Sequence, residues 1–327
     1  MIDFVIPWVD GSDPVWQASF RAHLPESKRT DDIRAVRYRD WDNLRYWFRG
    51  VEKFTPWVNR IHFVTCGQIP EWLNMDAPKL HFVKHEDYIP KHYLPTFSAN
   101  PIEINMHRIE GLSEQFVYFN DDFFLIDEVK PDRFFKKGLP CDMAVLNSLR
   151  PGYITHIVLN DLEIINSVFS KREVLCKHFW RWFTPKMGDK LLRTLALLPW
   201  PSFTGIYNHH FPQGFLRSTL IEVWNKHGEM LAITSASKFR SISDVNQWLF
   251  RYWQLAKGDF FPLNVYKDSS YFEICDHSLE KIVETIKKQK KKIIVLNDGE
   301  VSSFEAAKKR INAAFYELLP EKSSFEK

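Results

Sequence analysis

Residues 114–129 have the sequence EQFVYFNDDFFLIDEV, in which two adjacent carboxylates, Asp121 and Asp122, lie between two aromatic runs. The apolar residues before them, 116–119, predict a buried strand, and the apolar residues after them, 123–125, predict more core. Two interpretations are open at this point. The acids form a polar turn between two strands, or they are a metal-binding pair at the carboxyl end of a strand.

The first 130 residues alternate between strand signals and helix signals. Short apolar runs that predict buried strands occupy residues 2–9, 60–67, 79–87 and 115–121. Between them, apolar residues at helical spacing predict helices over 41–54 and over 100–112, the second ending near Gly111. Such alternation is typical of βαβ units, so we predict an α/β fold with a mostly parallel sheet flanked by helices.

Acidic loops directly follow three of these predicted strands. They contain Asp10–Asp13, Glu86–Asp87 and Asp121–Asp122. In open parallel sheets, ligands bind outside the carboxyl ends of the strands. The repeated placement of acids after strands therefore predicts a functional site at this edge of the sheet.

The sequence pattern changes after about residue 150. Residues 160–200 and 214–257 are rich in Trp and Phe and predict mainly helices, which we interpret as an insertion into the α/β core. A further strand and a final helix follow near the C-terminus. We therefore expect three parts: a core at 1–130, a mainly helical insertion at 131–260, and a segment at 261–327 that completes the core.

The composition is that of an ordinary globular protein, and a net charge of +3 is too small to indicate nucleic-acid binding. We find no signal segment and no apolar stretch long enough to cross a bilayer. The four cysteines are scattered without C-x-x-C spacing, which favours a cytosolic protein with reduced thiols. The basic run Lys287–Lys292 has two interpretations. It is a solvated helix end, or it attracts an anionic membrane surface or a polyanionic acceptor.

Several long motifs have unusual sequences. They are IDFVIPWVDGSDP (2–14), residues 37–74, LPTFSANPIEINMHRIEGLSEQFVYFNDDFFL (94–125), HHFPQGF (209–215) with residues 237–253, and residues 293–326. In this order they resemble the conserved regions of the Stealth family: the first three stretches are similar to regions one and two, the next to region three, and the last to region four. The family comprises bacterial capsular and cell-surface polysaccharide hexose-1-phosphoryltransferases and the animal GlcNAc-1-phosphotransferase. The least matched part is residues 130–205.

The resemblance implies a glycosyltransferase-A-like α/β fold that transfers a sugar 1-phosphate from a nucleotide sugar to a glycan hydroxyl. The acceptor hydroxyl attacks the β-phosphorus, and a nucleoside monophosphate leaves. The implied donor is a UDP-hexose or another nucleotide hexose, bound by residues 1–130. The implied acceptor is a glycan or a lipid-linked oligosaccharide, bound by residues 131–260. Capsular or exopolysaccharide synthesis places the chain in the cytoplasm, peripheral at the inner face of a bacterial membrane and in contact with its assembly machinery.

This chemistry requires a divalent cation, a cationic group on the transferred phosphoryl and a proton acceptor. Hard carboxylate oxygens suit Mg²⁺ or Mn²⁺, so the resemblance assigns the metal to Asp122 and Asp121. It also implies catalytic roles for Asp10, Asp121, His210 and Arg240. Residues expected to bind substrate are Asn43, Arg45, Asn120, His209, Asn297 and Asp298.

Most of these candidates also have a structural interpretation. Asp10 followed by glycine is an ordinary β-turn, and the polar residues that open helix 41–54 can simply cap it or pair on the surface. Arg240 can pair with Asp244, which follows at four residues. The pair Asn297–Asp298 can end a strand and cap the helix that begins near residue 302.

Two other functions remain open from the sequence. The first is an ordinary metal-dependent glycosyltransferase, in which the acceptor attacks the anomeric carbon and a nucleoside diphosphate leaves. The second is a carbohydrate-binding protein without catalytic activity. The released nucleotide distinguishes them, because only phosphoryl transfer yields a nucleoside monophosphate.

Overall fold

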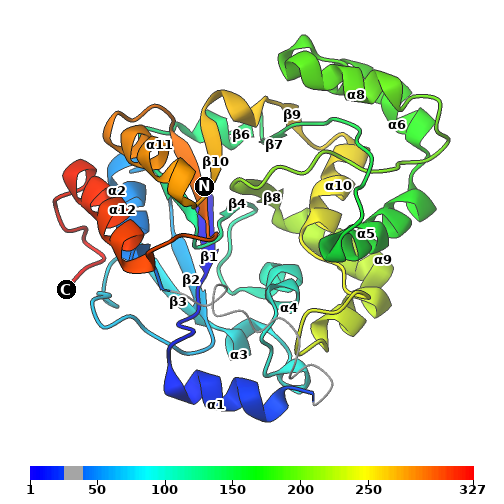
Figure 1. Cartoon of the computed structure of the whole chain (residues 1–327). Helices are drawn as coiled ribbons and strands as arrows, with labels where there is room; N and C mark the ends of the chain where they lie inside the picture. Colours follow the sequence, from blue (N-terminus) through cyan, green and yellow to red (C-terminus); the bar gives the residue numbers. More distant parts are fainter. Residues whose placement is uncertain (26–39) are drawn as a thin grey trace.

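The computed structural model describes residues 1–25 and 40–327 (Figure 1). Residues 37–39 of the stretch 37–74 therefore lie outside the described residues. The central sheet has the strand order β3–β2–β1–β4–β8. Its strands are β1 (Ile2–Pro7), β2 (Ile61–Thr65), β3 (Leu80–Lys84), β4 (Gln115–Tyr118) and β8 (Gln213–Leu216). The first four are parallel and β8 is antiparallel to β4, which confirms the predicted α/β fold with a mostly parallel sheet.

Two smaller sheets flank the central sheet. One has the order β10–β11–β5 and the other β6–β7–β9. Their strands are β5 (Phe123–Leu125), β6 (Phe135–Lys136), β7 (Leu139–Asp142), β9 (Phe261–Pro262), β10 (Ser269–Glu273) and β11 (Ile293–Asn297). Strand β5 follows β4 in the chain but pairs with β11, so the chain changes sheet directly after β4.

Helices cover both faces of the central sheet (Figure 1). In the first part of the chain these are α1 (Pro14–His23), α2 (Leu44–Phe54), α3 (His85–Tyr88) and α4 (Ala99–Ile104). The middle part contains α5 (Tyr153–Val168), α6 (Lys171–Lys177), α7 (Phe179–Trp182), α8 (Leu191–Ala196), α9 (Arg217–Ser235) and α10 (Trp248–Lys257). The last part contains α11 (Asp276–Lys287) and α12 (Phe304–Leu318). Within the described ranges, no helix combines the length and the apolar character needed to span a membrane.

The period-two alternation of each strand fills two separate hydrophobic cores. Phe4 of β1 and Val117 of β4 pack with α2, α11 and α12, whereas Val5 and Phe116 pack with α4, α5, α9 and α10. All four side chains are fully buried. Both faces of a parallel sheet are covered in this way, which is why its strands are continuous apolar runs in the sequence.

One expectation about an individual element was wrong. The helix predicted over 100–112 ends at Ile104, because the buried side chain of Asn105 donates hydrogen bonds to the Pro101 carbonyl and to Ser235 Oγ (both 2.9 Å). The stretch 214–257 is mainly helical, as predicted, but it begins with strand β8, which pairs with the free edge of β4. The segment 131–260 thus contributes a strand to the central sheet as well as α5–α10. The three-part division of the chain stays a prediction.

The buried carboxylate of Asp3 joins the three central strands. Asn59 Nδ2 donates to Asp3 Oδ1 (2.7 Å), and the backbone N–H of Ser113 donates to Asp3 Oδ2 (2.8 Å). His62 Nε2 on β2 lies 3.1 Å from Asp3 Oδ2. Burial alone would raise the pKa of Asp3, but these hydrogen bonds lower it to about 2. The ionised carboxylate therefore stabilises the junction of β1, β2 and the segment before β4.

We predict an acid-labile contribution from Asp3. Because its folded-state pKa lies below its ordinary value, its contribution is present above about pH 4 and is lost as the pH falls through about 2. The difference in free energy of unfolding between wild type and Asp3→Asn should shrink by about 2 kcal/mol across this interval. Urea unfolding at each pH measures it, with exposed Asp76→Asn as control. A difference that does not depend on pH would contradict this role.

Candidate active site

A pocket of about 220 Å³ lies beside the carboxyl end of β4. Four of the predicted site residues line it together: Asn120, His209, His210 and Arg240. They come from three segments: the end of β4, the residues before β8 and the loop before α10. The antiparallel pairing of Tyr118 with Gln213 explains the convergence, because the start of β8 lies beside the end of β4.

The pocket lies at the switch point of the central sheet. The chain runs from β1 to β2 and β3 on one side, and β4 then adds to the other side of β1. The loop that contains Asp10 and the turn Asn120–Asp122 therefore leave neighbouring strands at the same edge. This is the position at which open α/β sheets bind ligands. The acids Glu86–Asp87 follow β3 at the far edge, where Asp87 Oδ2 accepts a hydrogen bond from the Lys84 N–H (2.7 Å) in α3.

Residues Asn120–Asp122 form a turn between β4 and β5. The Phe123 N–H donates to the Asn120 carbonyl (3.2 Å), and the Leu296 N–H of β11 donates to the Asp122 carbonyl (2.9 Å). The turn interpretation is therefore correct as local geometry. It does not exclude a site, because the turn fixes both carboxyl groups at the edge of the sheet.

The carboxylate of Asp122 is incompletely satisfied. Its Oδ2 lies 3.4 Å from Nε2 of His210, whereas its Oδ1 is buried and has no hydrogen-bond partner among the described residues. A buried carboxylate oxygen without a partner is costly, so it indicates a missing positive group.

Asp121 differs from Asp122 in its environment. The residue is exposed at the pocket edge, but surrounding protein desolvates its carboxyl group. This desolvation, and next the charge of Asp122, raises the pKa of Asp121 to about 7. Asp40 adds a smaller effect in the same direction. Two neighbouring carboxylates that resist joint ionisation are suited to share a cation.

The residues present fit a divalent cation that is completed by a substrate. In residues 1–25 and 40–327, no cluster of three or more His, Cys, Asp or Glu side chains could hold a metal by itself. Asp121 and Asp122 nonetheless offer hard oxygen ligands, one of them the unsatisfied Oδ1. Mg²⁺ is commonly held by one or two carboxylates, with substrate phosphates and waters as its other ligands.

His210 is held at the mouth of this arrangement by aromatic contacts. Its ring packs edge-on against Phe123 (centroids 4.9 Å apart) and Tyr271 (5.9 Å). Its side chain retains 38% of its exposure. The ring is thus oriented by Asp122 and by two aromatic side chains, and it remains accessible to a ligand.

The neighbouring His209 is part of a buried polar network. Its Nε2 lies 2.9 Å from Asp142 Oδ1, and Asp142 also forms a two-point ion pair with Arg251 (2.8 and 3.0 Å). Gln213 Nε2 donates to the same carboxylate (3.1 Å). Burial alone would raise the pKa of Asp142, but Arg251 and His209 hold it well below its ordinary value. This network holds His209 in place and therefore also the backbone of the adjacent His210.

The buried acid Glu103 lies in the pocket wall and was not predicted as a site residue. Tyr118 OH donates to Glu103 Oε1 (2.9 Å), and the Gln247 N–H donates to Oε2 (3.4 Å). Burial raises the pKa of Glu103, and the charges of Arg240 and His210 oppose that rise. In the sequence, Glu103 looks like any acid of the predicted helix 100–112, so only its partners identify it.

Arg240 lines the same pocket as Glu103. Its carbonyl accepts a hydrogen bond from Tyr153 OH (2.9 Å), which fixes the loop before α10. Asp244, the alternative partner, accepts hydrogen bonds from Asn100 Nδ2 (2.9 Å) and from Ser237 Oγ (2.7 Å). The guanidinium therefore approaches the pocket from a loop that other contacts hold in place.

Asp10 lies in the loop after β1, outside the lining of the pocket. Its Oδ1 accepts hydrogen bonds from the N–H (2.8 Å) and Oγ (2.6 Å) of Ser12, which is the turn geometry expected as the alternative. Gln68 fixes the loop from below, because it accepts from the Asp10 N–H and donates to Asp13 Oδ2 (both 2.9 Å). Asp13 caps α1. We had no role for Gln68 from the sequence, since its partners are more than 50 residues away.

The remaining predicted residues border the edge without lining the pocket. Asn43 is the N-cap residue of α2, and its side chain makes no capping hydrogen bond. Arg45 pairs with Asp42 (3.2 Å). Asn297 is the last residue of β11, next to Leu296, whose N–H donates to the Asp122 carbonyl, and Asp298 follows the strand. They do not cap the final helix as the alternative expected, because α12 begins after residue 303, a serine that supplies the cap.

Comparisons with known proteins identify related sequences. Conserved region 1 of the Stealth proteins matches residues 2–24, and conserved region 2 matches residues 37–141. The chain is 44% identical to the capsular polysaccharide phosphotransferase WcwK of Streptococcus pneumoniae, over 100% of this chain and 98% of that protein. It is 42% identical to the receptor polysaccharide phosphotransferase WefC of Streptococcus oralis (99% of both chains). It is 40% identical to the exopolysaccharide phosphotransferase cps2G of Lactiplantibacillus plantarum (100% and 96%).

Solved structures show a looser similarity. The bifunctional glycosyltransferase WbbM is 11% identical with a TM-score of 0.41, covering 97% of this chain and 50% of that one. The galactosyltransferase LgtC, in complex with donor and acceptor sugar analogues, is 10% identical with a TM-score of 0.39, covering 96% and 95%.

We predict effects of different size on stability for the two adjacent histidines. His209→Ala removes a donor from the buried Asp142 carboxylate, so it should lower the free energy of unfolding by about 1–3 kcal/mol. His210→Ala removes a partly exposed ring and should lower it by less than about 1 kcal/mol. Urea unfolding of both variants measures the difference. Equal destabilisation would contradict the division between a supporting and an accessible histidine.

Proposed function

This chain belongs to the Stealth family of polysaccharide phosphotransferases, and we propose that it transfers a sugar 1-phosphate from a nucleotide sugar to a glycan hydroxyl. The product is a phosphodiester linkage in a capsular polysaccharide or exopolysaccharide. One observation supports the proposal above others: an unsatisfied carboxylate, a histidine and an arginine meet at the carboxyl edge of β4. An ordinary glycosyltransferase and a silent carbohydrate-binding protein are not favoured, because the full-length relatives are phosphotransferases.

In the proposed reaction, an acceptor oxygen forms a bond to the β-phosphorus of the donor. The bond from that phosphorus to the bridging oxygen breaks, and a nucleoside monophosphate leaves with the bonding electrons. His210 accepts the proton of the attacking hydroxyl, since imidazole is suited to proton transfer near neutral pH. Arg240 donates to the oxygens of the transferred phosphoryl, which its planar fork matches.

We assign the divalent cation, Mg²⁺ or Mn²⁺, to Asp122 with Asp121. When bound, such an ion neutralises the donor diphosphate and favours departure of the monophosphate. The unsatisfied Oδ1 of Asp122 supports the first assignment. Asp121 has a raised pKa and must lose a proton before it can bind a cation, so we place it as the weaker ligand.

The other predicted residues are proposed to hold the donor. Asp10 and the residues that open α2 border the same edge of the sheet, where a helix N-terminus favours anions. His209 acts through its hold on Asp142. Residues proposed to contact the nucleotide or sugar are Asp10, Asn43, Arg45, Asn120, Asn297 and Asp298. The donor is a UDP-hexose or another nucleotide hexose, and the acceptor is a glycan or a lipid-linked oligosaccharide.

We further propose that the chain works in the cytoplasm, against the inner face of the bacterial membrane. Exposed apolar side chains occur on α7, on α8 and just after α8, and Figure 1 shows α8 away from the central sheet. They are Phe179, Trp180, Leu192, Leu195, Leu198 and Trp200. Trp180 is 83% exposed and Trp200 51%. Tryptophan and leucine beside basic side chains are typical of segments that lie in the interface of an anionic bilayer. Arg172 and Lys177 of the preceding helix α6 are also exposed.

The product of the reaction tests the proposed function. We expect incubation with Mg²⁺, a panel of nucleotide sugars and a glycan acceptor to release a nucleoside monophosphate. The glycan should gain a phosphodiester signal in the ³¹P NMR spectrum. Release of a nucleoside diphosphate with no phosphorus in the glycan would refute phosphoryl transfer.

Three variants connect that product to the site. Asp122→Ala, His210→Ala and Arg240→Ala should each lower turnover by about 10²–10⁴-fold, because each removes a group placed at the reacting phosphoryl. Asp76→Ala, an exposed acid outside the site, should retain wild-type turnover. Near-normal turnover in all three site variants would refute the roles assigned to these residues, even if the product is the expected phosphodiester.

Membrane attachment is tested with vesicles. Wild-type protein should co-sediment with vesicles of phosphatidylglycerol and phosphatidylcholine, and less with phosphatidylcholine alone, because basic side chains favour an anionic surface. Trp180→Ser with Trp200→Ser should lose most of this binding. Tyr316→Ser, a control at a 59% exposed aromatic of α12, should not. Equal binding by the double variant and wild type would contradict the assignment.

A further inference from the structure

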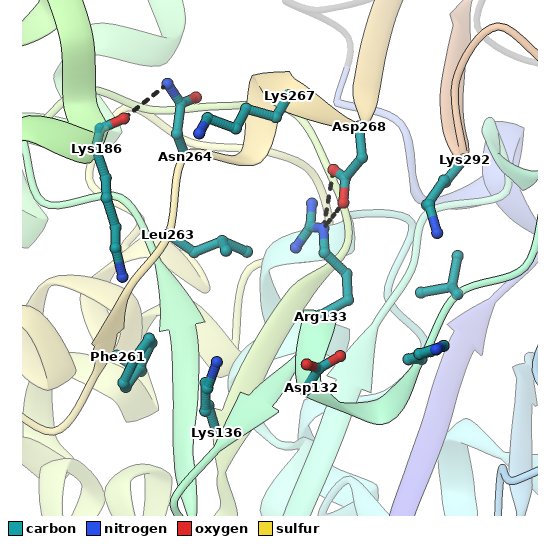
Figure 2. A pocket seen from close by; sticks show the side chains of 12 residues that line it. Asp132, Arg133, Lys136, Lys186, Phe261, Leu263, Asn264, Lys267, Asp268 and Lys292 are labelled. Atoms are coloured by element: carbon teal, nitrogen blue, oxygen red, sulfur yellow. Dashed lines mark hydrogen bonds and ion pairs between the residues drawn. The ribbon is translucent and has the colours of Figure 1, made fainter.

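A second pocket, with none of the lining residues of the active-site pocket, lies at the amino end of β11 (Figure 2). Its volume is about 330 Å³. It is bordered by β6, by Phe261 of β9 and by the residues just before β10 and β11. The active site lies near Asn297, beyond the carboxyl end of β11. We call this second cavity the basic pocket.

Six cationic side chains converge on the basic pocket: Lys130, Arg133, Lys136, Lys186, Lys267 and Lys292. Only two acids line it, so four positive charges are left in excess. The whole chain has a net charge of only +3, so the excess is local. A concave surface with one sign of charge concentrates ligands of the opposite sign.

Ion pairs do not account for this cluster. Arg133 pairs with Asp268 (2.8 Å), and Lys292 donates to the Glu128 carbonyl (2.7 Å). Among the residues that the structure describes, no acid lies within ion-pair distance of Lys130, Lys136, Lys186 or Lys267. In the basic run Lys287–Lys292, by contrast, Lys287, Lys288 and Lys290 pair with glutamates. Lys292 is the residue of this run that lines the pocket.

The ring of Phe261 holds two of these lysines in place. Lys186 Nζ lies 4.9 Å and Lys136 Nζ 5.2 Å from the ring centroid. Both are cation–π distances, and Figure 2 shows both lysines next to the ring. The attraction to the ring opposes the mutual repulsion of two ammonium groups. They are therefore partly oriented before any anion arrives.

The remaining lining fits a sugar attached to the anion. The carboxylate of Asp132 and the side chain of Asn264 can bond hydroxyl groups, and Leu263 offers apolar contact. Asn264 is fixed, because its Nδ2 donates to the Lys186 carbonyl (3.2 Å). The Asp132 carboxylate would repel inorganic phosphate, so it does not suit a site for phosphate alone. The volume is at the lower end of that of small-molecule sites, which favours a single sugar-phosphate unit.

Strand β7 connects the basic pocket to the active site. Lys136 pairs with Leu139 at the amino end of β7, and Asp142 at its carboxyl end bonds His209 of the active site. Three residues of strand span roughly 10 Å. One glycan chain can therefore be close to both sites.

We propose that the basic pocket binds a phosphate-bearing sugar unit of the glycan that the enzyme elongates. The inference rests on the proposed function, because phosphoryl transfer gives the glycan one negative charge per new linkage. Lys136, Lys186 and Lys267 contact the phosphate, and Asp132 and Asn264 contact the sugar hydroxyls. The pocket thereby retains a chain that already carries phosphodiesters.

Acylation of lysine amines, read residue by residue by mass spectrometry, tests the proposal on the full chain. Glucose 1-phosphate is the probe, with glucose and inorganic phosphate as comparisons. Acylation of Lys136, Lys186 and Lys267 should fall several-fold with glucose 1-phosphate and be unchanged with glucose. Exposed Lys281 and Lys309 are internal controls. No lysine lines the described active-site pocket, so the signal reports the basic pocket.

A pair of matched variants sharpens the result. Lys136→Ala with Lys186→Ala should abolish protection of Lys267, whereas Lys281→Ala with Lys309→Ala removes the same charge and should preserve it. Absence of protection, or equal protection of the control lysines, would overturn the inference. Equal protection by inorganic phosphate would overturn its sugar component. The footprint requires no turnover, so a failed transfer assay would reject the proposed function without affecting this result.

Discussion

The parallel pairing of β1 with β4 is the constraint on which the site depends. It places the Asp10 loop and the turn Asn120–Asp122 at one edge, because both strands run in the same direction. The antiparallel β8 then brings His210 to that edge from a distant part of the chain. Each strand buries side chains on both faces, so a slip of one residue would exchange the two cores. The hydrophobic alternation thus fixes the position of the acids.

The degree of hydrogen-bond satisfaction separates supporting acids from reacting ones. Asp3 and Asp142 are buried, each bonds several donors, and both have lowered pKa values. Asp122 keeps a buried oxygen without a partner among the described residues, and the pKa of Asp121 is raised. Completed networks rigidify a fold, whereas incomplete ones leave room for a ligand. The contrast explains why adjacent histidines have different roles: one bonds a satisfied acid and the other an unsatisfied one.

Local patterns in the sequence predicted the parallel sheet, its strands and the acids at its edge. They could not predict β8, because its four residues have no strand signal apart from the partner edge of β4. The helix break at Asn105 was likewise missed, since its bond to Ser235 spans 130 residues. Glu103, Gln68 and Arg251 were missed as site supports for the same reason: their roles come from contacts distant in sequence. Residue types fixed the chemistry, and long-range packing selected which residues perform it.

The central claim is that the donor diphosphate lies between Asp122 and Arg240 at the carboxyl edge of β4. A crystal structure with Mg²⁺ and the nucleotide sugar that the enzyme turns over tests it most directly. We predict that the cation contacts Asp122 Oδ1, that the β-phosphoryl faces Arg240, and that His210 faces the attacking side of that phosphorus. A diphosphate bound elsewhere, for example among the lysines of the basic pocket, would contradict the account.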